Sequence, residues 1–131
     1  MVDGNRNRIL IVDDTDALMK VLPLTTKKLP YDYVGESTVA EAVKNMKADR
    51  PSVAIIDYNI GGIGDGVQVV EAANAMGIKV IMVSGNAKVA EKAKELEVPF
   101  VEKGVGYVPK LIEQISQTLR HTDRKQASPG R

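Results

Sequence analysis

Four short apolar runs, each followed at once by polar or charged side chains, dominate the hydrophobic pattern of this chain. Each run is uncharged and rich in valine or isoleucine, which is typical of a parallel strand buried on both faces of a sheet. The carboxyl ends of parallel strands meet at one edge of a sheet, so the polar residues after the runs are expected to meet there too. The runs and the residues that follow them are Ile9–Val12 with Asp13 and Asp14, Val53–Ile56 with Asp57, Val80–Val83 with Ser84, and Val98–Val101 with Glu102 and Lys103.

Helical periodicity fills the intervals between these runs. Asp16 is placed to cap a first helix, and Pro23 within its apolar stripe predicts a kink or an early end. Thr38–Glu41 resembles a capping box and predicts the start of a second helix. The stripe of the first helix is Leu18, Val21, Leu22, Thr25 and Leu29. Three further helices are expected at about Val67–Met76, Ala87–Glu97 and Gly106–Arg120.

The order of the predicted elements indicates the fold. Tyr31–Glu36 is a further, more polar strand, whose polarity suits the edge of a sheet. Five strands that alternate with five helices predict an α/β fold with right-handed crossovers. With the second strand at an edge, the strand order becomes 2-1-3-4-5, the flavodoxin-like doubly wound (βα)5 arrangement. In this order the chain reverses direction between the first and third strands, which places Asp13, Asp14 and Asp57 at a ligand crevice.

The whole pattern fits one domain. A chain of 131 residues is long enough for one hydrophobic core and too short for two domains of ordinary size. We expect a flexible lead-in over residues 1–7, the folded domain over residues 8–121, and a disordered tail or linker over residues 122–131.

The composition narrows the class of protein. A net charge of +1 gives no bulk attraction to nucleic acid or to an anionic membrane, so neither is expected as a partner. The absence of cysteine excludes thiolate catalysis and cysteine-bound metal. The polar start and the lack of a membrane-length apolar run predict neither a signal peptide nor a transmembrane helix, and the cytoplasm is the default expectation.

Acidic residues define the chemistry of the predicted crevice. Three carboxylates at close range raise one another's pKa, and a divalent cation relieves that repulsion. Oxygen ligands favour Mg²⁺ over zinc, and Mg²⁺ combines one or two carboxylates with water and a phosphate oxygen. With the amine of Lys103 and the hydroxyl of Ser84, the crevice suits a tetrahedral dianion. A central carboxylate can itself be the nucleophile of phosphoryl transfer.

In these residues the chain resembles the receiver domains of response regulators from bacterial two-component systems, from about Arg8 to Arg120. The resemblance rests on five residues at strand ends, namely Asp13, Asp14, Asp57, Ser84 and Lys103. It implies that Asp57 is the phosphoacceptor, that Asp14 binds Mg²⁺ directly, and that Asp13 binds it through water. Ser84 would hydrogen-bond the phosphoryl group, and Lys103 would pair with it.

The resemblance also implies a switch and partners. Asn59, two residues after the acceptor, would offer its backbone carbonyl to the metal. Phe100 falls on the aromatic switch position, whose ring turns inward on phosphorylation, so that the face of the fourth helix, fifth strand and fifth helix changes its partners. The phosphoryl group would come from a histidine kinase or a phosphotransfer protein, and the output would be contact with an unknown protein. The chain would not be an enzyme beyond its own phosphorylation and dephosphorylation.

Two departures from the family pattern affect the site. Gly104 follows Lys103 where proline is usual, and because a non-proline cis bond costs about 3 kcal/mol, we expect a trans bond here. After Asp57, the glycine-rich stretch Gly61–Gly66 lacks the usual proline and contains one extra residue. The turn that carries Asn59 is therefore expected to differ from the family's.

Two other functions stay open. A receiver-like binding module that works without phosphate is favoured by Gly104 and the glycine-rich stretch. A haloacid-dehalogenase-like phosphatase is suggested by Asp14-Thr15-Asp16, which mimics its Asp-x-Asp motif with Asp14 as nucleophile. Against the phosphatase, the sequence shows neither the acidic metal pair expected after the lysine nor a cap domain.

Tyr58 and Tyr107 are expected at the surface.

Overall fold

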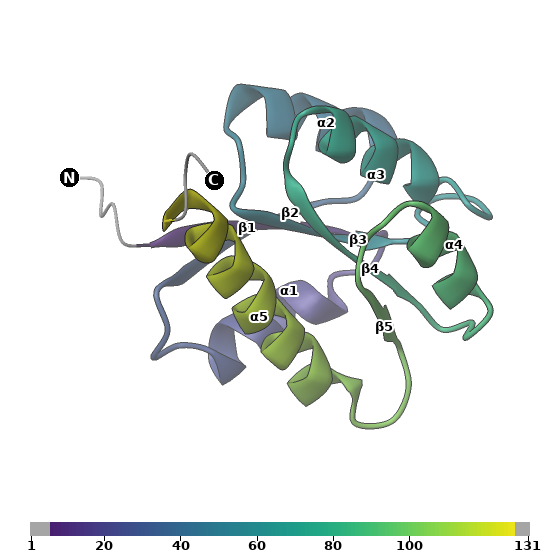
Figure 1. Cartoon of the computed structure of the whole chain (residues 1–131). Coiled ribbons are helices and arrows are strands. Elements are labelled where there is room, and N and C mark those ends of the chain that lie inside the picture. Colours follow the sequence, from purple (N-terminus) through teal and green to yellow (C-terminus); the bar gives the residue numbers. More distant parts are fainter. Residues whose placement is uncertain (1–5, 128–131) are drawn as a thin grey trace.

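The computed structural model describes residues 6–127, with side chains described through residue 120. Within these residues the chain forms five strands that alternate with five helices (Figure 1). The strands are β1 (Asn7–Val12), β2 (Tyr31–Glu36), β3 (Val53–Asp57), β4 (Lys79–Ser84) and β5 (Phe100–Glu102). The helices are α1 (Ala17–Thr25), α2 (Val39–Ala48), α3 (Gly66–Ala75), α4 (Val89–Glu95) and α5 (Tyr107–Ala127). None of these described helices is both long and apolar enough to cross a membrane.

The strands form one parallel sheet in the order β2-β1-β3-β4-β5, which confirms the predicted doubly wound fold. Helices α2, α3 and α4 pack on one face, and α1 and α5 pack on the other (Figure 1). Successive side chains of β3 alternate between the two layers, with Ala54 and Ile56 in the first and Val53 and Ile55 in the second. All four are almost completely buried. Asp57, the last residue of β3, therefore emerges at the carboxyl edge of the sheet.

Helix α1 is shorter than its apolar stripe suggested. It passes through Pro23 and ends two residues later, because the hydroxyl and the N–H of Thr26 both donate to the carbonyl of Leu22, at 2.7 and 3.0 Å. Leu29, predicted on the inward stripe, consequently lies beyond the helix and is 40% exposed.

The first two helices also begin differently. In α2 the hydroxyl of Thr38 accepts the N–H of Glu41 at 3.1 Å, as the capping box predicted. In α1 the carboxylate of Asp16 makes no cap bond, and lies instead 3.4 Å from the ammonium of Lys20. The predicted cap at Asp16 is therefore wrong, because its backbone is not in the extended conformation that aims a capping side chain at the helix.

Both limits of the folded domain lie further out than expected. Asn7 is paired in β1, and the guanidinium of Arg6 bonds both carboxylate oxygens of Asp32. Helix α5 continues to Ala127 rather than ending at Arg120. The added turns contain good helix formers such as arginine, lysine, glutamine and alanine, and no proline or glycine. Six residues of the predicted tail are thus helical, while residues 1–5 and 128–131 lie outside the described part.

The last strand is shorter and later than its apolar run suggested. The run predicted Val98–Val101, whereas β5 begins at Phe100. Pro99 has no N–H to donate to a ladder, and its carbonyl accepts the N–H of Met82 at 2.9 Å, so it marks the entry to the strand. Helix α4 is also shorter than predicted, because it covers Val89–Glu95 of the helix expected at Ala87–Glu97.

Candidate acidic site at the carboxyl edge

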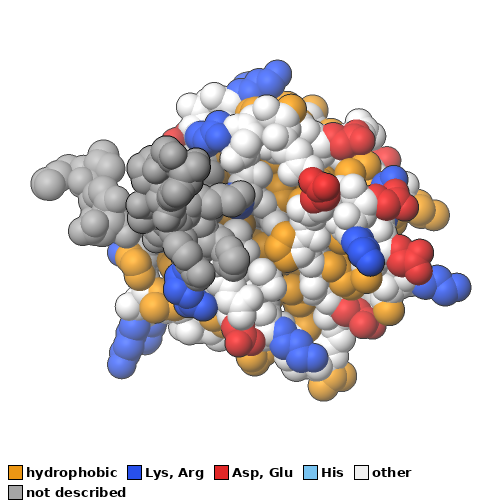
Figure 2. Space-filling view, in the orientation of Figure 1, with side chains coloured by type: hydrophobic (Ala, Val, Ile, Leu, Met, Phe, Trp, Pro, Cys, Tyr) orange, Lys and Arg blue, Asp and Glu red, His pale blue; other side chains and the backbone are white. Residues whose placement is uncertain are grey.

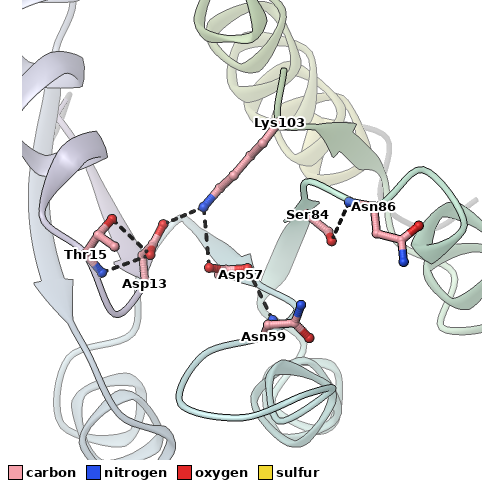
Figure 3. Close-up of polar contacts among 7 residues, drawn as sticks. All are labelled: Asp13, Thr15, Asp57, Asn59, Ser84, Asn86 and Lys103. Atoms are coloured by element: carbon pink, nitrogen blue, oxygen red, sulfur yellow. Dashed lines mark hydrogen bonds and ion pairs between the residues drawn. The ribbon is translucent and has the colours of Figure 1, made fainter. Parts of the chain in front are cut away.

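The carboxyl edge of the sheet brings together the acids that the sequence marked. Asp13 and Asp14 follow β1 and Asp57 ends β3, and these two strands are neighbours. One carboxylate oxygen of each acid lies within 4.8 Å of the other two. Lys103 and Ser84 lie on different sides of Asp57 (Figure 3). The strand order therefore assembles the predicted constellation in one place.

Asp13 is the buried acid of this group, with 5% of its surface exposed. Its Oδ1 accepts the N–H of Thr15 at 3.0 Å and the hydroxyl of Thr15 at 3.3 Å, and its Oδ2 accepts the ammonium of Lys103 at 2.9 Å. Thr15 was not predicted as a site residue. An acid followed two residues later by a threonine can form an Asx turn, and that spacing is the signal that could have identified it. Both oxygens of Asp13 thus have protein partners.

Lys103 connects the two inner acids (Figure 3). Its ammonium also lies 3.4 Å from Oδ2 of Asp57. Burial alone would lower the pKa of Lys103, but the hydrogen bond to Asp13 and the charges of Asp57 and Asp13 outweigh burial and raise that pKa. The lysine is therefore firmly charged in this position.

Burial raises the pKa of the Asp57 carboxyl. The charge of Lys103 and the N–H of Asn59, which donates to Oδ1 of Asp57 at 3.2 Å, lower this pKa, and the charge of Asp13 raises it. The net effect on the pKa is upward, because burial is the largest of these influences. The ionised form of Asp57 would consequently be stabilised by a further cation.

The donor chemistry of the site fits a divalent cation. Asp14 is exposed and completes the group of three carboxylates. Among the described residues, the ammonium of Lys103 is the one positive charge that pairs with this group. Two negative charges remain uncompensated, and the donors are oxygen atoms, as Mg²⁺ prefers. Asp16, the second acid of the phosphatase-like motif, is exposed and pairs with Lys20 instead of joining the group.

Ser84 presents a buried hydroxyl beside Asp57. Its side chain is 2% exposed, and its Oγ accepts the N–H of Asn86 at 3.1 Å (Figure 3). The carbonyl of Ser84 accepts the N–H of Lys103 at 2.8 Å, which ties the ends of β4 and β5 together. Because Oγ is used as an acceptor, its own hydrogen can be donated to an oxygen bound in the crevice.

The glycine-rich loop lies tightly under Asp57. A Cβ on Gly66 would lie 2.2 Å from the carbonyl oxygen of Asp57, so only glycine fits where α3 begins. The N–H of Gly66 donates to the carbonyl of Tyr58 at 2.8 Å, and the side-chain oxygen of Asn59 accepts the N–H of Gly64 at 2.9 Å. The side chain of Asn59 thus holds the loop closed, while the role predicted for its carbonyl stays a prediction.

The loop after Lys103 is open by comparison. No cis peptide bond occurs in the described residues, so the bond to Gly104 is trans, as expected. A Cβ on Gly104 would meet nothing within 4 Å, and Val105 is fully exposed. Lys103 is therefore held by its ion pairs and by the sheet rather than by the residues that follow it.

Three aromatic residues that the sequence analysis singled out are partly buried. Phe100 is partly buried and packs against the layer of α2, α3 and α4. Tyr107, predicted at the surface, is partly buried against the layer of α1 and α5, and burial raises its pKa while the charge of Lys103 lowers it. Tyr58 is also partly buried rather than exposed. The sequence contained no pattern that distinguished these tyrosines from surface residues.

Comparisons with known proteins agree with the fold. The family model described as "Response regulator receiver domain" matches residues 9–120. The chain is similar to a signal receiver domain from Vibrio parahaemolyticus (21% identity, 96% of this chain and 99% of that one, TM-score 0.82). It is also similar to the response regulator protein TrrA from Thermotoga maritima, solved as a complex with Mg(2+)-BeF (21% identity, 86% and 99% covered, TM-score 0.74).

The chain is also similar to part of a longer curated protein. "Probable transcriptional regulator ycf27" from Pyropia yezoensis is 25% identical over 134 residues, which cover 98% of this chain and 54% of that protein. The chain thus spans about half the length of this curated relative. Receiver domains are phosphoacceptors that take the group on an aspartate, generally without being enzymes. From its match over residues 9–120 and its doubly wound fold, the chain belongs to the response regulator receiver domain family.

Proposed function

We propose that this receiver domain accepts a phosphoryl group on Asp57 from a histidine kinase or a phosphotransfer protein. The observation that carries the proposal is the position of Asp57, which ends β3 with Lys103 at 3.4 Å and the carboxylates of Asp13 and Asp14 beside it. Family membership supports the chemistry. Within the described site, the geometry supports Asp57 as the accepting residue, and the histidine-containing donor is part of the proposal.

The transfer proceeds by attack of an Asp57 oxygen on phosphorus. The bond between phosphorus and the donor's histidine nitrogen breaks as the new acyl phosphate bond forms, and the imidazole leaves with the electron pair and takes up a proton. Lys103 lies where it can neutralise an oxygen of the transferred group, and Ser84 can donate its hydroxyl hydrogen to another. Hydrolysis of the acyl phosphate at the same site is the only other catalysis that we propose.

Asp13, Asp14 and Asp57 would hold Mg²⁺, together with the backbone carbonyl of Asn59. When bound, the ion supplies positive charge that stabilises phosphoryl oxygens. Asp13 already has partners for both oxygens, which supports a role through water rather than in direct contact. Asp14 is exposed and able to bind directly.

The output would be a change in a protein-binding face formed by α4, β5 and α5. Phe100 is the proposed switch residue, and it lies opposite Met82 in the ladder that joins β5 to β4. Ser84 follows Met82 by two residues in β4 and lies opposite Glu102 of β5. A displacement of Ser84 toward a phosphoryl group would therefore act on the strand beside Phe100.

Phosphorylation tests the assignment directly. Wild-type protein incubated with Mg²⁺ and acetyl phosphate should gain the mass of one phosphoryl group, whereas Asp57→Asn should gain none. Asp16→Asn is the matched control, because Asp16 is an exposed acid outside the group, and it should be labelled normally.

Each other outcome identifies a different function. Labelling that persists in Asp57→Asn but disappears in Asp14→Asn, with turnover of phosphomonoesters, would establish the phosphatase instead. A folded wild-type protein that gains no mass and shows no amide shifts with beryllium fluoride would establish a binding module that works without phosphate.

A further inference from the structure

A second cleft lies at the opposite, amino edge of the sheet. It has a volume of about 410 Å³, and it is bounded by the end of α3, the start of β4, the segment from α4 into β5, and α5. None of its lining residues belongs to the acidic site. Hydrophobic side chains reach the surface between α5 and this segment in Figure 2. The volume is in the range of small-molecule sites.

The ladder between β4 and β5 stops at this cleft. The carbonyl of Ser84 accepts the N–H of Lys103 at 2.8 Å. Two residues earlier in β4, the N–H of Met82 donates to the carbonyl of Pro99 at 2.9 Å. Alternate residues of a strand direct their backbone groups to the same neighbour. The N–H and carbonyl of Val80, two residues earlier again, therefore face the same side, where Val80 lines the cleft.

Val80 makes no ladder bond on that side. In the register of β4 and β5, its N–H would donate to the carbonyl of Glu97 and its carbonyl would accept the N–H of residue 99. Neither bond, nor another to these two groups on that side, occurs in the described part of the chain. Val80 is 3% exposed, and backbone groups that are so deeply buried normally have partners.

Two residues explain why the ladder stops. Residue 99 is a proline and has no N–H to donate. Glu97 has a left-handed backbone, with a φ of 61°, instead of the extended conformation that a strand requires. It occupies the position after α4 that Gly77, with a φ of 73°, occupies after α3 on the same cleft. The unpaired N–H and carbonyl of Val80, which we call the ladder gap, are thus fixed by the sequence.

The rest of the lining is apolar or neutral overall. Ile78, Val98 and Pro99 add apolar surface, which favours a ligand with an apolar body over water. The formal charges of the one lysine and the one glutamate in the lining cancel, so the lining gives no preference for a charged ligand. On α5, Gln114 and Gln117 contribute amides, each with donors and an acceptor.

From the ladder gap and this neutral lining, we infer that the cleft binds a neutral, planar small molecule of the cyclic amide class. The ring carbonyl accepts the N–H of Val80, and the ring N–H beside it donates to the carbonyl of Val80. A cyclic amide carries these two groups on adjacent atoms of one ring, whose remaining edge is free to contact the apolar lining. The inference does not depend on phosphorylation of Asp57.

Three neutral probes of similar shape test the pair of hydrogen bonds. 2-Pyridone has a ring N–H beside its carbonyl, N-methyl-2-pyridone lacks the donor, and 2-methoxypyridine lacks both the donor and the carbonyl. Each is titrated into the full chain while amide resonances are followed. 2-Pyridone should bind with a Kd on the order of 1 mM, as its few atoms allow, and about fivefold more tightly than either other probe. Equal binding of the three probes, or 2-pyridone shifts confined to the acids around Asp57, would overturn the inference.

Hydrogen exchange reports the contact at Val80 itself. Without a probe, the N–H of Val80 should exchange roughly tenfold faster than that of Met82, which is bonded to Pro99. At ten times its Kd, 2-pyridone should slow exchange at Val80 roughly tenfold, because the N–H is then paired in most molecules. Equal exchange at Val80 and Met82 in the free protein would show that the ladder has no gap, and unchanged exchange at Val80 with the probe would place the probe elsewhere.

A substitution can close the ladder gap from the protein side. Pro99→Ala supplies the missing N–H, which should pair with the carbonyl of Val80. Binding of 2-pyridone should then weaken about fivefold, whereas binding of N-methyl-2-pyridone should change little, because that probe has no donor for the same carbonyl. A folded Pro99→Ala protein that still distinguishes the two probes fivefold contradicts the inference.

A second substitution fills the cleft without changing the ladder. Gln117→Phe, at an exposed lining position on α5, should abolish binding of 2-pyridone. Glu113→Phe is the matched control, because Glu113 is an exposed residue of the same helix outside the lining, and it should leave the affinity unchanged. Binding that survives Gln117→Phe, or that is lost equally in both variants, excludes this cleft as the site.

Discussion

The carboxyl and amino edges of the sheet are organised by different interactions. At the carboxyl edge, three acids lie close together, one lysine pairs with two of them, and buried Asp13 is fixed through both of its oxygens. At the amino edge, two helices end beside neutral side chains, and the strained residue there is exposed Glu97. The carboxyl edge is therefore organised by side-chain ion pairs, and the amino edge by backbone geometry. Substitutions at the two edges should therefore change the free energy of unfolding for different physical reasons.

The largest expected effect comes from the tight side of the carboxyl edge. Gly66→Ala should lower the free energy of unfolding by about 3 kcal/mol, because the new Cβ would overlap the carbonyl of Asp57. Gly104→Ala, on the open side, should leave it unchanged or raise it by roughly 0.5 kcal/mol. Urea denaturation measures both, and equal losses would show that the two loops are equally packed.

Lys103→Met should cost about 2 kcal/mol in protein freed of divalent ions, because it leaves the buried Asp13 charge without its partner. Lys20→Met is the control, since its pair with Asp16 is exposed and should contribute less than about 0.5 kcal/mol. Denaturation at neutral pH with a chelator compares the two variants. If Lys20→Met costs as much as Lys103→Met, the carboxyl edge is not organised by this ion pair.

Asp57→Asn should stabilise the metal-free protein at pH 7 by on the order of 1 kcal/mol. Burial raises the pKa of Asp57 in the folded state, so the stability that this group contributes is present at low pH and is lost as the pH rises through the raised pKa. The advantage of the variant should therefore disappear below about pH 4, where the carboxyl is protonated. Denaturation curves between these pH values test this, with exposed Asp14→Asn as control. Parallel stability profiles for wild type and Asp57→Asn would contradict the expectation.

The smallest effects are expected at the amino edge. Glu97→Gly should raise the free energy of unfolding by roughly 0.5 kcal/mol by removing the strained side chain, and Gly77→Ala should lower it by about 1 kcal/mol. The two changes act in opposite directions at equivalent helix ends. Thermal unfolding of the pair would show the opposite signs, whereas two losses would mean that the Glu97 side chain makes stabilising contacts.

The sequence predicted the fold well because its strongest pattern is hydrophobic. Short runs rich in valine and isoleucine, such as Val53–Ile56, favour a strand covered on both faces, and the polarity of Tyr31–Glu36 predicted that this strand lies at the edge. The helix ends were predicted less well. The end of α1 depends on the hydroxyl of Thr26, and the length of α5 depends on the absence of helix breakers after Arg120. Local hydrogen bonds and helix propensities decide where a helix ends, and hydrophobic periodicity does not indicate either of them.

The site was predictable as a group of residues but not as a set of contacts. The strand order placed Asp13 and Asp57 together, yet the sharing of Lys103 between them appears only in three dimensions. Thr15 and the partial burial of Tyr107 were missed for the same reason. These features depend on which side chains reach a common point, and spacing along the chain does not encode that distance.

The open loop after Lys103 has a practical consequence. Val105 is fully exposed between two glycines, and the 131-residue sequence contains no cysteine. A Val105→Cys substitution would therefore create the only thiol of this sequence. A fluorophore attached there would sit two residues from Lys103 and touch little of the folded protein. This position offers an optical reporter of events at the acidic site in solution.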